Sequence, residues 1–368
     1  MAFISAMERK SLLNKTLLSV LLAWICVNSF AQIQVSIAPY YQGRKAALSL
    51  TFDDGLKDQY TLLRPELNRR GLRATFAIIG SKVGGIMHSS QDKSMGITGT
   101  PCMTWEMIRQ LVADGHEIAS HGWEHKNVTK LSVGRLLNEV QRNDSVILEQ
   151  TGCFPMSYFY PGNQKDSATV AFCERGRVGS RTFQTSIGSK RESTWLRQWL
   201  ISLIERGEWG VGMTHGIATG YDHFANPKVL WAFLDDVTAH QDSLWVAPFS
   251  EVAAYVRERD NTSLKIKQEG QKVIVTPHCM LPPTIFHQPL TLIVNTEAVK
   301  DVHQGTTKLH FHQHNGQTQI DFLPNGGDII IEKAKRYDEL SRVYTAPKRI
   351  AWKVGNKTRK TDQRHSQK

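Results

Sequence analysis

Short apolar runs alternate with amphipathic stretches along most of the chain. Seven of these runs have the length and composition of buried strands, at residues 46–52, 74–79, 117–120, 157–160, 178–184, 210–214 and 244–247. The segments between them place apolar residues at helical spacing, as Leu62, Leu63 and Leu67 do. Buried strands that alternate with amphipathic helices are typical of a parallel sheet, either open or closed into a barrel. We therefore predict an α/β domain over residues 32–259.

The hydrophobic pattern changes after residue 259. Short alternating runs follow at residues 264–267, 273–276, 290–294, 309–314, 320–323 and 328–332, and no stretch of helical spacing interrupts them. Residues 260–263 have the composition of a linker. Several short strands in succession are typical of a sandwich. The pattern predicts a small, all-β, sandwich-like accessory domain over residues 264–335, to which the sequence assigns no function.

The first 31 residues have the layout of a secretory signal peptide. Three basic residues precede the apolar run 16–27, and small residues at positions 29 and 31 form a cleavage site before Gln32. The run is too short for a comfortable membrane span. We expect a secreted or periplasmic protein with no integral membrane span. Lipid anchoring at Cys26 is the less favoured alternative, because Ile25 is bulky for a lipoprotein cleavage site.

The formal net charge of +11 suggests a nucleic-acid partner at first sight. Much of the excess lies in residues 347–368, where eight Lys and Arg residues stand against Asp362 alone. Charge concentrated in this way is typical of a solvated, disordered tail. Hydrophobic residues make up 40% of the chain and charged residues 21%, which indicates an otherwise ordinary globular protein. We expect no nucleic-acid partner.

Four cysteines, at positions 102, 153, 173 and 279, remain after removal of the predicted signal peptide. They do not form a CxxC pair, which argues against a structural metal site built from thiolates. An oxidising compartment permits disulfides. Four cysteines allow three complete pairings, and the sequence does not choose between them.

Acidic residues and histidines follow three of the predicted strands. They are Asp53 and Asp54 after the first strand, His121 and His125 after the third, and His215 after the sixth. By itself, the dipeptide Asp54-Gly55 is a common turn. The carboxyl ends of parallel strands meet at one edge of the sheet, however, and chemistry collects there. The joint placement favours one shared site over three unrelated turns.

The spacing of the histidines indicates a metal site. His121 and His125 stand four residues apart, so a helical turn at this point would direct both imidazoles to the same side. Two histidines and one carboxylate leave coordination positions open, as a catalytic metal site requires. Water bound to such a metal becomes a nucleophile near neutral pH. His116, in contrast, is explained as a surface or hydrogen-bonded residue.

Four motifs, taken in order, resemble a known family. They are Thr51-Phe52-Asp53-Asp54-Gly55, Ser120-His121-Gly122-Trp123-Glu124-His125, Tyr160-Pro161-Gly162-Asn163 and Thr214-His215-Gly216. The chain resembles the polysaccharide deacetylases with a NodB-homology domain, carbohydrate esterase family four. Residues 244–252 also resemble the close of that domain in secreted bacterial members. The resemblance covers residues 43–259 and does not extend to the accessory domain.

The resemblance implies a distorted (β/α) barrel of seven strands that removes acetyl groups from an acetylated poly- or oligosaccharide by hydrolysis. An N-acetyl amide is the first expectation for the bond that is cleaved. The resemblance also implies that Asp54, His121 and His125 bind a divalent metal, most often zinc. Asp53 would be the general base for the metal-bound water, and His215 the general acid.

Two positions depart from the family pattern. The third motif of the family often carries an Arg two residues before the proline, where it pairs with the base, but this chain has Phe159 there. Arg181, at the end of the fifth strand, is a candidate for the missing cation. The acidic residue that often orients the acid histidine is absent from residues 182–190. Asp222 or another carboxylate is left as a possible partner of His215.

Residues near the motifs are candidates for contact with the sugar. This set consists of Tyr160, Arg181, Trp123 and Tyr221. Aromatic rings suit the role because they stack on the apolar C–H face of a sugar. A backbone N–H near Tyr160 or Gly162 is expected to hold the oxyanion. In the accessory domain, His310, His312 and His314 share one strand face, and a partly solvated face explains them better than a metal site.

Two other functions stay open on the sequence. One is an O-acetyl esterase, since the same attack of water cleaves an ester. The other is a catalytically weak carbohydrate-binding protein, which would explain the missing Arg and the missing acidic residue. The leading prediction is a secreted, metal-dependent polysaccharide deacetylase, a hydrolase of carbon–nitrogen or carboxylic ester bonds.

Overall fold

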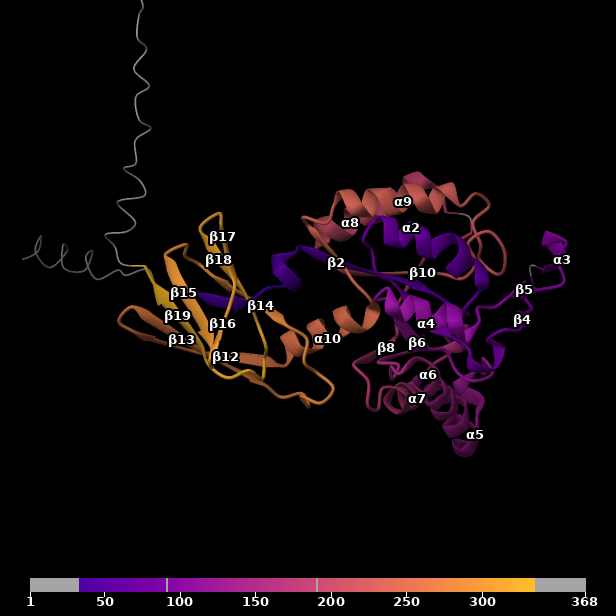
Figure 1. Ribbon diagram of the computed structural model, residues 1–368, viewed down its shortest axis with the longest axis horizontal. Coiled ribbons are helices and arrows are strands. Elements are labelled where there is room, and N and C mark those ends of the chain that lie inside the picture. Colours follow the sequence, from indigo (N-terminus) through magenta and orange to yellow (C-terminus); the bar gives the residue numbers. More distant parts are fainter. Residues whose placement is uncertain (1–32, 91, 190, 335–368) are drawn as a thin grey trace, which may run out of the picture.

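The computed structural model describes residues 33–334, apart from residues 91 and 190. The predicted signal peptide and the basic tail at residues 347–368 lie outside the described residues. An α/β domain and an all-β domain follow one another along the longest axis of the molecule, with helix α10 (Phe249–Asp260) between them (Figure 1).

One parallel sheet forms the centre of the α/β domain. Its strands are β2 (Ala46–Phe52), β3 (Thr75–Ile78), β6 (Glu117–Ser120), β7 (Ser157–Phe159), β8 (Gly179–Arg181), β9 (Thr185–Ser186), β10 (Trp209–Thr214) and β11 (Leu244–Val246). Their order is β8-β7-β6-β3-β2-β10-β9, and β11 also pairs with β2. β8 and β9 stand at opposite ends of this order, yet only residues 182–184 separate them in the chain. The sheet therefore curls into the predicted barrel, and β9 is an eighth, two-residue strand that the sequence did not indicate.

Helices cover the outside of this sheet (Figure 1). They are η2 (Gln59–Leu63), α2 (Arg64–Arg69), α4 (Trp105–Ala113), α5 (Val133–Leu137), η5 (Asn138–Arg142), α6 (Asn143–Thr151), α7 (Ser167–Cys173), α8 (Ser193–Arg206) and α9 (Lys228–Ala239). Leu200 of α8 and Leu234 of α9 are fully buried in one core with Leu48 and Leu50 of β2. Burial of each such side chain contributes about 1.5–3 kcal/mol. All seven residues of β2 are buried, which explains its continuous apolar run.

A long connection after β3 projects from the barrel. It contains η3 (Gly80–Lys82), the strands β4 (Ile86–Met87) and β5 (Thr100–Pro101), and the short helix α3 (Asp92–Met95). β4 and β5 pair antiparallel, so the predicted loop over residues 81–103 is partly a hairpin. In Figure 1 this arm lies at the end of the molecule opposite the accessory domain.

Two antiparallel sheets form the accessory domain and confirm the predicted all-β region. The first has the order β1-β14-β18-β17 and the second the order β12-β13-β19-β15-β16. Their bounds are β1 (Val35–Ile37), β12 (Thr262–Glu269), β13 (Lys272–Cys279), β14 (Leu290–Val294), β15 (Val299–Gln304), β16 (Thr307–Lys308), β17 (Phe311–His314), β18 (Gln317–Phe322) and β19 (Ile329–Lys333). Both sheets contribute to one apolar core, which includes Val275, Leu292 and Ile331.

The accessory domain also receives residues from before the barrel. β1 pairs antiparallel with β14, with Val35 opposite Val294. The sequence-based range for this domain, 264–335, does not include β1, because a three-residue strand has too short a pattern to recognise. The expected linker at residues 260–263 is wrong, since α10 continues to Asp260 and β12 begins at Thr262.

Helix α10 belongs to both domains. Phe249 at its start packs with barrel residues. Tyr255 lies in the sandwich core, and its hydroxyl donates a hydrogen bond to the carbonyl oxygen of Ala38 at 2.9 Å. One continuous helix thus fixes the accessory domain to the barrel.

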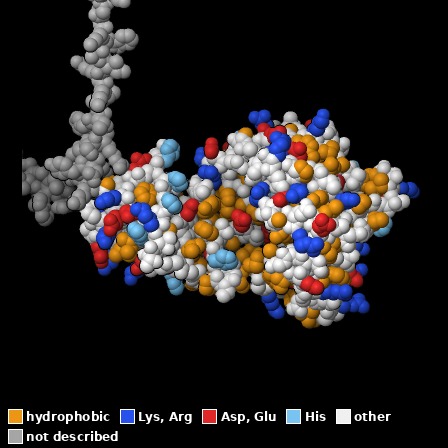
Figure 2. Space-filling model, viewed as in Figure 1, with side chains coloured by type: hydrophobic (Ala, Val, Ile, Leu, Met, Phe, Trp, Pro, Cys, Tyr) orange, Lys and Arg blue, Asp and Glu red, His pale blue; other side chains and the backbone are white. Residues whose placement is uncertain are grey.

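The described residues also bear on three further expectations, which concern membrane spans, disulfides and the histidines of the accessory domain. No helix among them is both long and apolar enough to cross a membrane. The four cysteines are free thiols, so none of the three possible disulfide pairings forms. The histidines His310, His312 and His314 are exposed, and pale-blue histidine side chains are visible on the surface of the accessory domain in Figure 2.

Candidate active site

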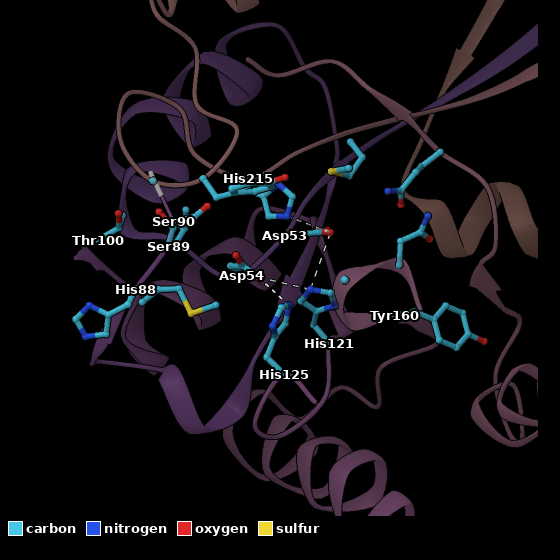
Figure 3. A pocket seen from close by; sticks show the side chains of 18 of the residues that line it. Asp53, Asp54, His88, Ser89, Ser90, Thr100, His121, His125, Tyr160 and His215 are labelled. Atoms are coloured by element: carbon cyan, nitrogen blue, oxygen red, sulfur yellow. Dashed lines mark ion pairs between the residues drawn. The ribbon is translucent and has the colours of Figure 1, made fainter. Parts of the chain in front are cut away.

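The predicted catalytic and metal-binding residues meet in one cavity of about 420 Å³ at the carboxyl ends of the strands. Its lining includes the side chains of Asp53, Asp54, His121, His125 and His215. Figure 3 shows these five side chains pointing toward one another. The arm after β3 lines part of the same cavity with His88, Ser89, Ser90 and Thr100. The expectation of one shared site at the strand ends is met by the geometry.

Asp54 and two histidines form a compact cluster of metal-ligand type. The Oδ1 atom of Asp54 lies 3.5 Å from Nε2 of His121 and 3.6 Å from Nε2 of His125. Among the described residues, no other group of three His, Cys, Asp or Glu side chains has this arrangement. The Asp54 Oδ1 atom is buried and has no hydrogen-bond partner in the described part of the chain. A buried acceptor oxygen between two imidazole nitrogens fits a divalent cation.

His121 and His125 differ in the features that suit each of them to bind a metal: a hydrogen bond in one and a lowered pKa in the other. His121 donates a hydrogen bond from Nδ1 to the carbonyl oxygen of Phe159 at 2.9 Å, because a carbonyl oxygen can only accept. This hydrogen bond leaves Nε2 of His121 facing Asp54. Histidine ligands of metals are commonly oriented by a backbone carbonyl that accepts from the other ring nitrogen. Burial lowers the pKa of His125 to about 4, so this imidazole is neutral near neutral pH.

The loop that carries the histidines is not a helical turn. His125 has a φ of 62°. The two imidazoles are therefore brought together by a loop with left-handed backbone, and the helical explanation of their four-residue spacing is wrong. Asp54 (φ 72°), Asn163 and Asp222 also have positive φ, so four of the six such non-glycine residues in the described chain lie in or beside the cavity. Unfavourable backbone of this type collects at functional sites.

Asp53 is held by Arg181. The Nη1 and Nη2 atoms of Arg181 donate to the two carboxylate oxygens of Asp53 at 2.8 and 2.5 Å, and Nη1 also donates to Oγ1 of Thr51 at 2.9 Å. Burial opposes ionisation of Asp53, but Arg181, together with His121 and His215, holds the pKa of this carboxyl below its usual range. The guanidinium lies on the ring of Phe159, 4.0 Å from its centroid. Arg181 thus lines the cavity as the partner of Asp53.

His215 lies between two carboxylates. Its Nε2 atom is 4.0 Å from Oδ2 of Asp53, and its Nδ1 atom is 4.0 Å from Oδ2 of Asp222. Asp222 accepts hydrogen bonds from the hydroxyls of Ser189 at 2.6 Å and Ser186 at 3.2 Å. The stretch 182–190 therefore contributes hydroxyls that hold Asp222, where the family often has an acidic residue. Asp222 was one of the partners that the sequence left open.

The predicted sugar contacts are only partly in the cavity. Tyr221 lines it, is 45% exposed, and meets the His215 ring edge-on at 4.9 Å. Tyr160 also lines it, although its hydroxyl is directed to Ser180 Oγ at 2.9 Å. Trp123 is not among the lining residues; its indole stacks under the guanidinium of Arg142, 4.1 Å away. The structure therefore does not place Trp123 with the other candidates.

Two positioning residues escaped the sequence-based prediction. Nε2 of Gln59 donates to the carbonyl oxygens of Asp53 at 2.6 Å and His215 at 2.8 Å. Oδ2 of Asp58 accepts from three successive backbone N–H groups, at residues 217–219, over 2.8–3.1 Å. Gln59 and His215 are 156 positions apart in the chain, and Asp58 and Ile217 are 159 apart. A local pattern gives no signal for such pairs.

Comparisons with known proteins agree with this site. Residues 41–175 match the family described as polysaccharide deacetylase. A peptidoglycan-N-acetylglucosamine deacetylase of Listeria monocytogenes is 28% identical over 109 residues, which are 29% of this chain and 20% of that protein. A chitin deacetylase of Pestalotiopsis sp is 24% identical over 139 residues, 38% of this chain and 41% of that protein. The chain thus spans one fifth of the length of the Listeria relative.

Solved structures give a further comparison. The structure of a peptidoglycan deacetylase from Bacillus subtilis is 15% identical, covers 56% of this chain and 89% of its own, and has a TM-score of 0.40. The family match over residues 41–175 includes the motifs around Asp54 and His125. The first part of the barrel, residues 41–175, is therefore similar to the polysaccharide deacetylase family.

Proposed function

We propose that the α/β domain is a metal-dependent hydrolase that removes acetyl groups from a carbohydrate, with an N-acetyl amide as the preferred bond. One observation carries the proposal. A carboxylate paired with Arg181, a cluster of metal-ligand type and the imidazole of His215 line a single cavity. The family match and the polysaccharide substrates named for the relatives support the same class of substrate.

Asp54, His121 and His125 would hold the cation. Their imidazole and carboxylate donors suit Zn²⁺ first among the divalent metals. The buried, unpartnered Oδ1 atom of Asp54 supports this assignment. When bound, the cation supplies Lewis acidity toward an acetyl carbonyl and an attacking water.

Asp53 is proposed as the general base. Arg181 keeps its carboxylate ionised, and Oδ2 faces the cavity within 4.0 Å of both His121 and His215. In the reaction, Asp53 would accept one proton from the attacking water while the water oxygen forms a bond to the acetyl carbon. A backbone N–H near Tyr160 or Gly162 stays our prediction for the oxyanion.

His215 is proposed as the general acid. Its Nε2 atom would donate a proton to the departing nitrogen as the carbon–nitrogen bond breaks, giving acetate and a free amine. The Asp222 carboxylate lies 4.0 Å from Nδ1 and is proposed to orient the ring. The reaction therefore needs both carboxylates, one on each side of His215.

Acetate release tests this assignment. Zinc-loaded protein and an Asp53→Asn variant are compared on a panel of N-acetylated glycans. We expect the variant to lose on the order of 10²–10⁴-fold in kcat/KM, because the base is removed while the size of the side chain is kept. The matched control is Asp242→Asn, at an exposed position after α9. Unchanged activity in Asp53→Asn would rule out Asp53 as the base.

The second candidate function is an O-acetyl esterase. The same attack of water cleaves an ester, with His215 protonating a departing oxygen. Matched N-acetyl and O-acetyl forms of one oligosaccharide distinguish the two, and a larger kcat/KM on the ester would replace the amide as the preferred bond. A merely carbohydrate-binding protein would release no acetate from either.

We also propose that the protein acts outside the cytoplasm. The signal-like residues 1–31 support this, and so do relatives named for peptidoglycan and chitin. Protein recovered from the culture medium or periplasm should begin at Gln32. A cytoplasmic product that retains residues 1–31 would contradict the proposal.

A further inference from the structure

The loop that carries both histidines must be held in an unfavourable conformation. Residues 121–127, between β6 and η4 (Val128–Lys130), form no helix or strand. His125 has a φ of 62° and Gly122 a φ of 78°. A non-glycine residue keeps a positive φ only where its surroundings impose it. Some group outside the loop must therefore hold His125.

Glu139 of η5 supplies that group. Its carboxylate is 3% exposed and accepts hydrogen bonds from the backbone N–H of Glu124 (3.0 and 3.1 Å) and of Lys126 (2.9 Å). The backbone carbonyl of Glu139 also accepts from the N–H of Trp123 at 2.8 Å. The carboxylate therefore binds the residues on both sides of His125. None of the ion pairs among the described residues includes Glu139, and the neighbouring Lys126 lies 4.0 Å from Glu124 instead.

The surrounding residues are adapted to this carboxylate. A Cβ atom at Gly122 would lie 2.5 Å from Oε1 of Glu139, so any other residue there would have to displace this carboxylate. Asn143, four residues after Glu139, donates from Nδ2 to Ile78 O at 2.9 Å and to Ser120 Oγ at 3.0 Å. The helix makes a wide π turn over η5, at Glu139. Single π turns of this kind occur frequently at functional sites.

We propose that Glu139 is a positioning residue of the metal site: its buried carboxylate holds the loop 121–126 so that Nε2 of His125 faces Oδ1 of Asp54. Hydrogen bonds from N–H groups to a charged acceptor are stronger than those to a neutral one. Glu139 is not itself one of the three proposed metal ligands, so its carboxylate acts on the metal site through the loop. The inference rests on the metal site of the proposed function and needs no knowledge of the substrate.

Zinc affinity, measured by chelator competition on the full chain, tests the role of Glu139. We expect Glu139→Gln to bind Zn²⁺ about 10–100-fold more weakly than the unchanged protein, since loss of outer partners of metal ligands has effects of this size. The amide keeps one acceptor oxygen and the size of the side chain, so the variant should fold. Co²⁺ absorption spectra give a second measurement, and an altered ligand field is expected in Glu139→Gln.

Glu117→Gln is the matched control. Glu117 begins β6, at the other end of the strand, and its carboxylate accepts from Thr75 Oγ1 at 2.8 Å, Ser157 Oγ at 2.5 Å and Ser250 N at 2.9 Å. This variant should lose thermal stability with unchanged Zn²⁺ affinity and Co²⁺ spectrum. Equal loss of affinity in both variants, or none in Glu139→Gln, would overturn the inference. Failure of the unchanged protein itself to bind Zn²⁺ would instead overturn the proposed metal site.

Discussion

Arg181 reaches Asp53 from a strand where the family pattern does not place an arginine. The pattern expects the cation at position 159 of β7, and this chain has phenylalanine there. Phe159 and Arg181 are register partners on the neighbouring strands β7 and β8. Side chains of register partners lie next to each other on one face of a sheet. In this chain the arginine thus stands on the strand next to the position where the family often carries one, and its guanidinium lies over the Phe159 ring.

A cross-strand exchange tests this interpretation. Arg181→Met should lower the free energy of unfolding by about 3–5 kcal/mol, because it leaves a buried carboxylate without its cation. It should also lower kcat/KM by on the order of 10²-fold. The double variant Phe159→Arg/Arg181→Phe should recover a large part of both losses. Urea unfolding and acetate release measure the two effects, and no recovery in the double variant would contradict the equivalence of the two positions.

At the scale of elements, one loop contributes the residues that lie beside His215. The segment 216–224 follows β10 and contains Tyr221 and Asp222. Asp58 accepts from three N–H groups at its start, and Gln59 donates to the carbonyl oxygens of His215, just before the loop, and of Asp53, just after β2. These two side chains come from the other end of the barrel sequence and link the two strands that carry Asp53 and His215.

Asp58→Ala should loosen this loop. Hydrogen bonds to a charged group contribute about 1.5–3 kcal/mol each, so we expect a lower Tm and about a tenfold lower kcat/KM. Asp58→Asn keeps one acceptor oxygen and should be intermediate. Calorimetry and acetate release measure these effects, with the exposed Asp242→Ala as control. Full activity in Asp58→Ala would mean that the loop is held by other contacts.

At the scale of the whole molecule, α10 joins two cores through a buried acid. Glu258 is fully buried, and its Oε2 accepts from the N–H of Gln288 at 2.9 Å. Its Oε1 atom is buried without a hydrogen-bond partner among the described residues. Burial raises the pKa of Glu258 to about 7. The junction therefore contains an acid that stays protonated at pH values where an exposed glutamate ionises.

This raised pKa predicts how stability depends on pH. In the unfolded chain Glu258 ionises near its ordinary pKa of 4.5, whereas in the folded protein it keeps its proton to about pH 7. Between these pH values Glu258 binds fewer protons in the unfolded chain than in the folded protein. The contribution of Glu258 to the free energy of unfolding therefore falls as pH rises, by about 1.4 kcal/mol per pH unit, and is constant above about pH 7. Glu258→Gln should remove this fall. Urea unfolding from pH 4 to 8 measures it, with the exposed Glu205→Gln as control.

A curve for Glu258→Gln parallel to that of the unchanged protein would show that the acid is not responsible.

Two elements connect the accessory domain to the barrel. Because β1 and α10 both contribute to the sandwich, the barrel and the accessory domain share their stability.

The sequence by itself determined most of the barrel strands and the candidate residues of the site. Continuous apolar runs marked the barrel strands, since burial of both faces leaves a local pattern, and motifs at three strand ends marked Asp53, Asp54, His121, His125 and His215. Only the tertiary structure decided that Arg181 pairs with Asp53, that Asp222 stands beside His215 and that β1 joins the accessory domain. Strand order and register create these contacts between residues 128 positions apart, as for Arg181 and Asp53, and no local pattern encodes them.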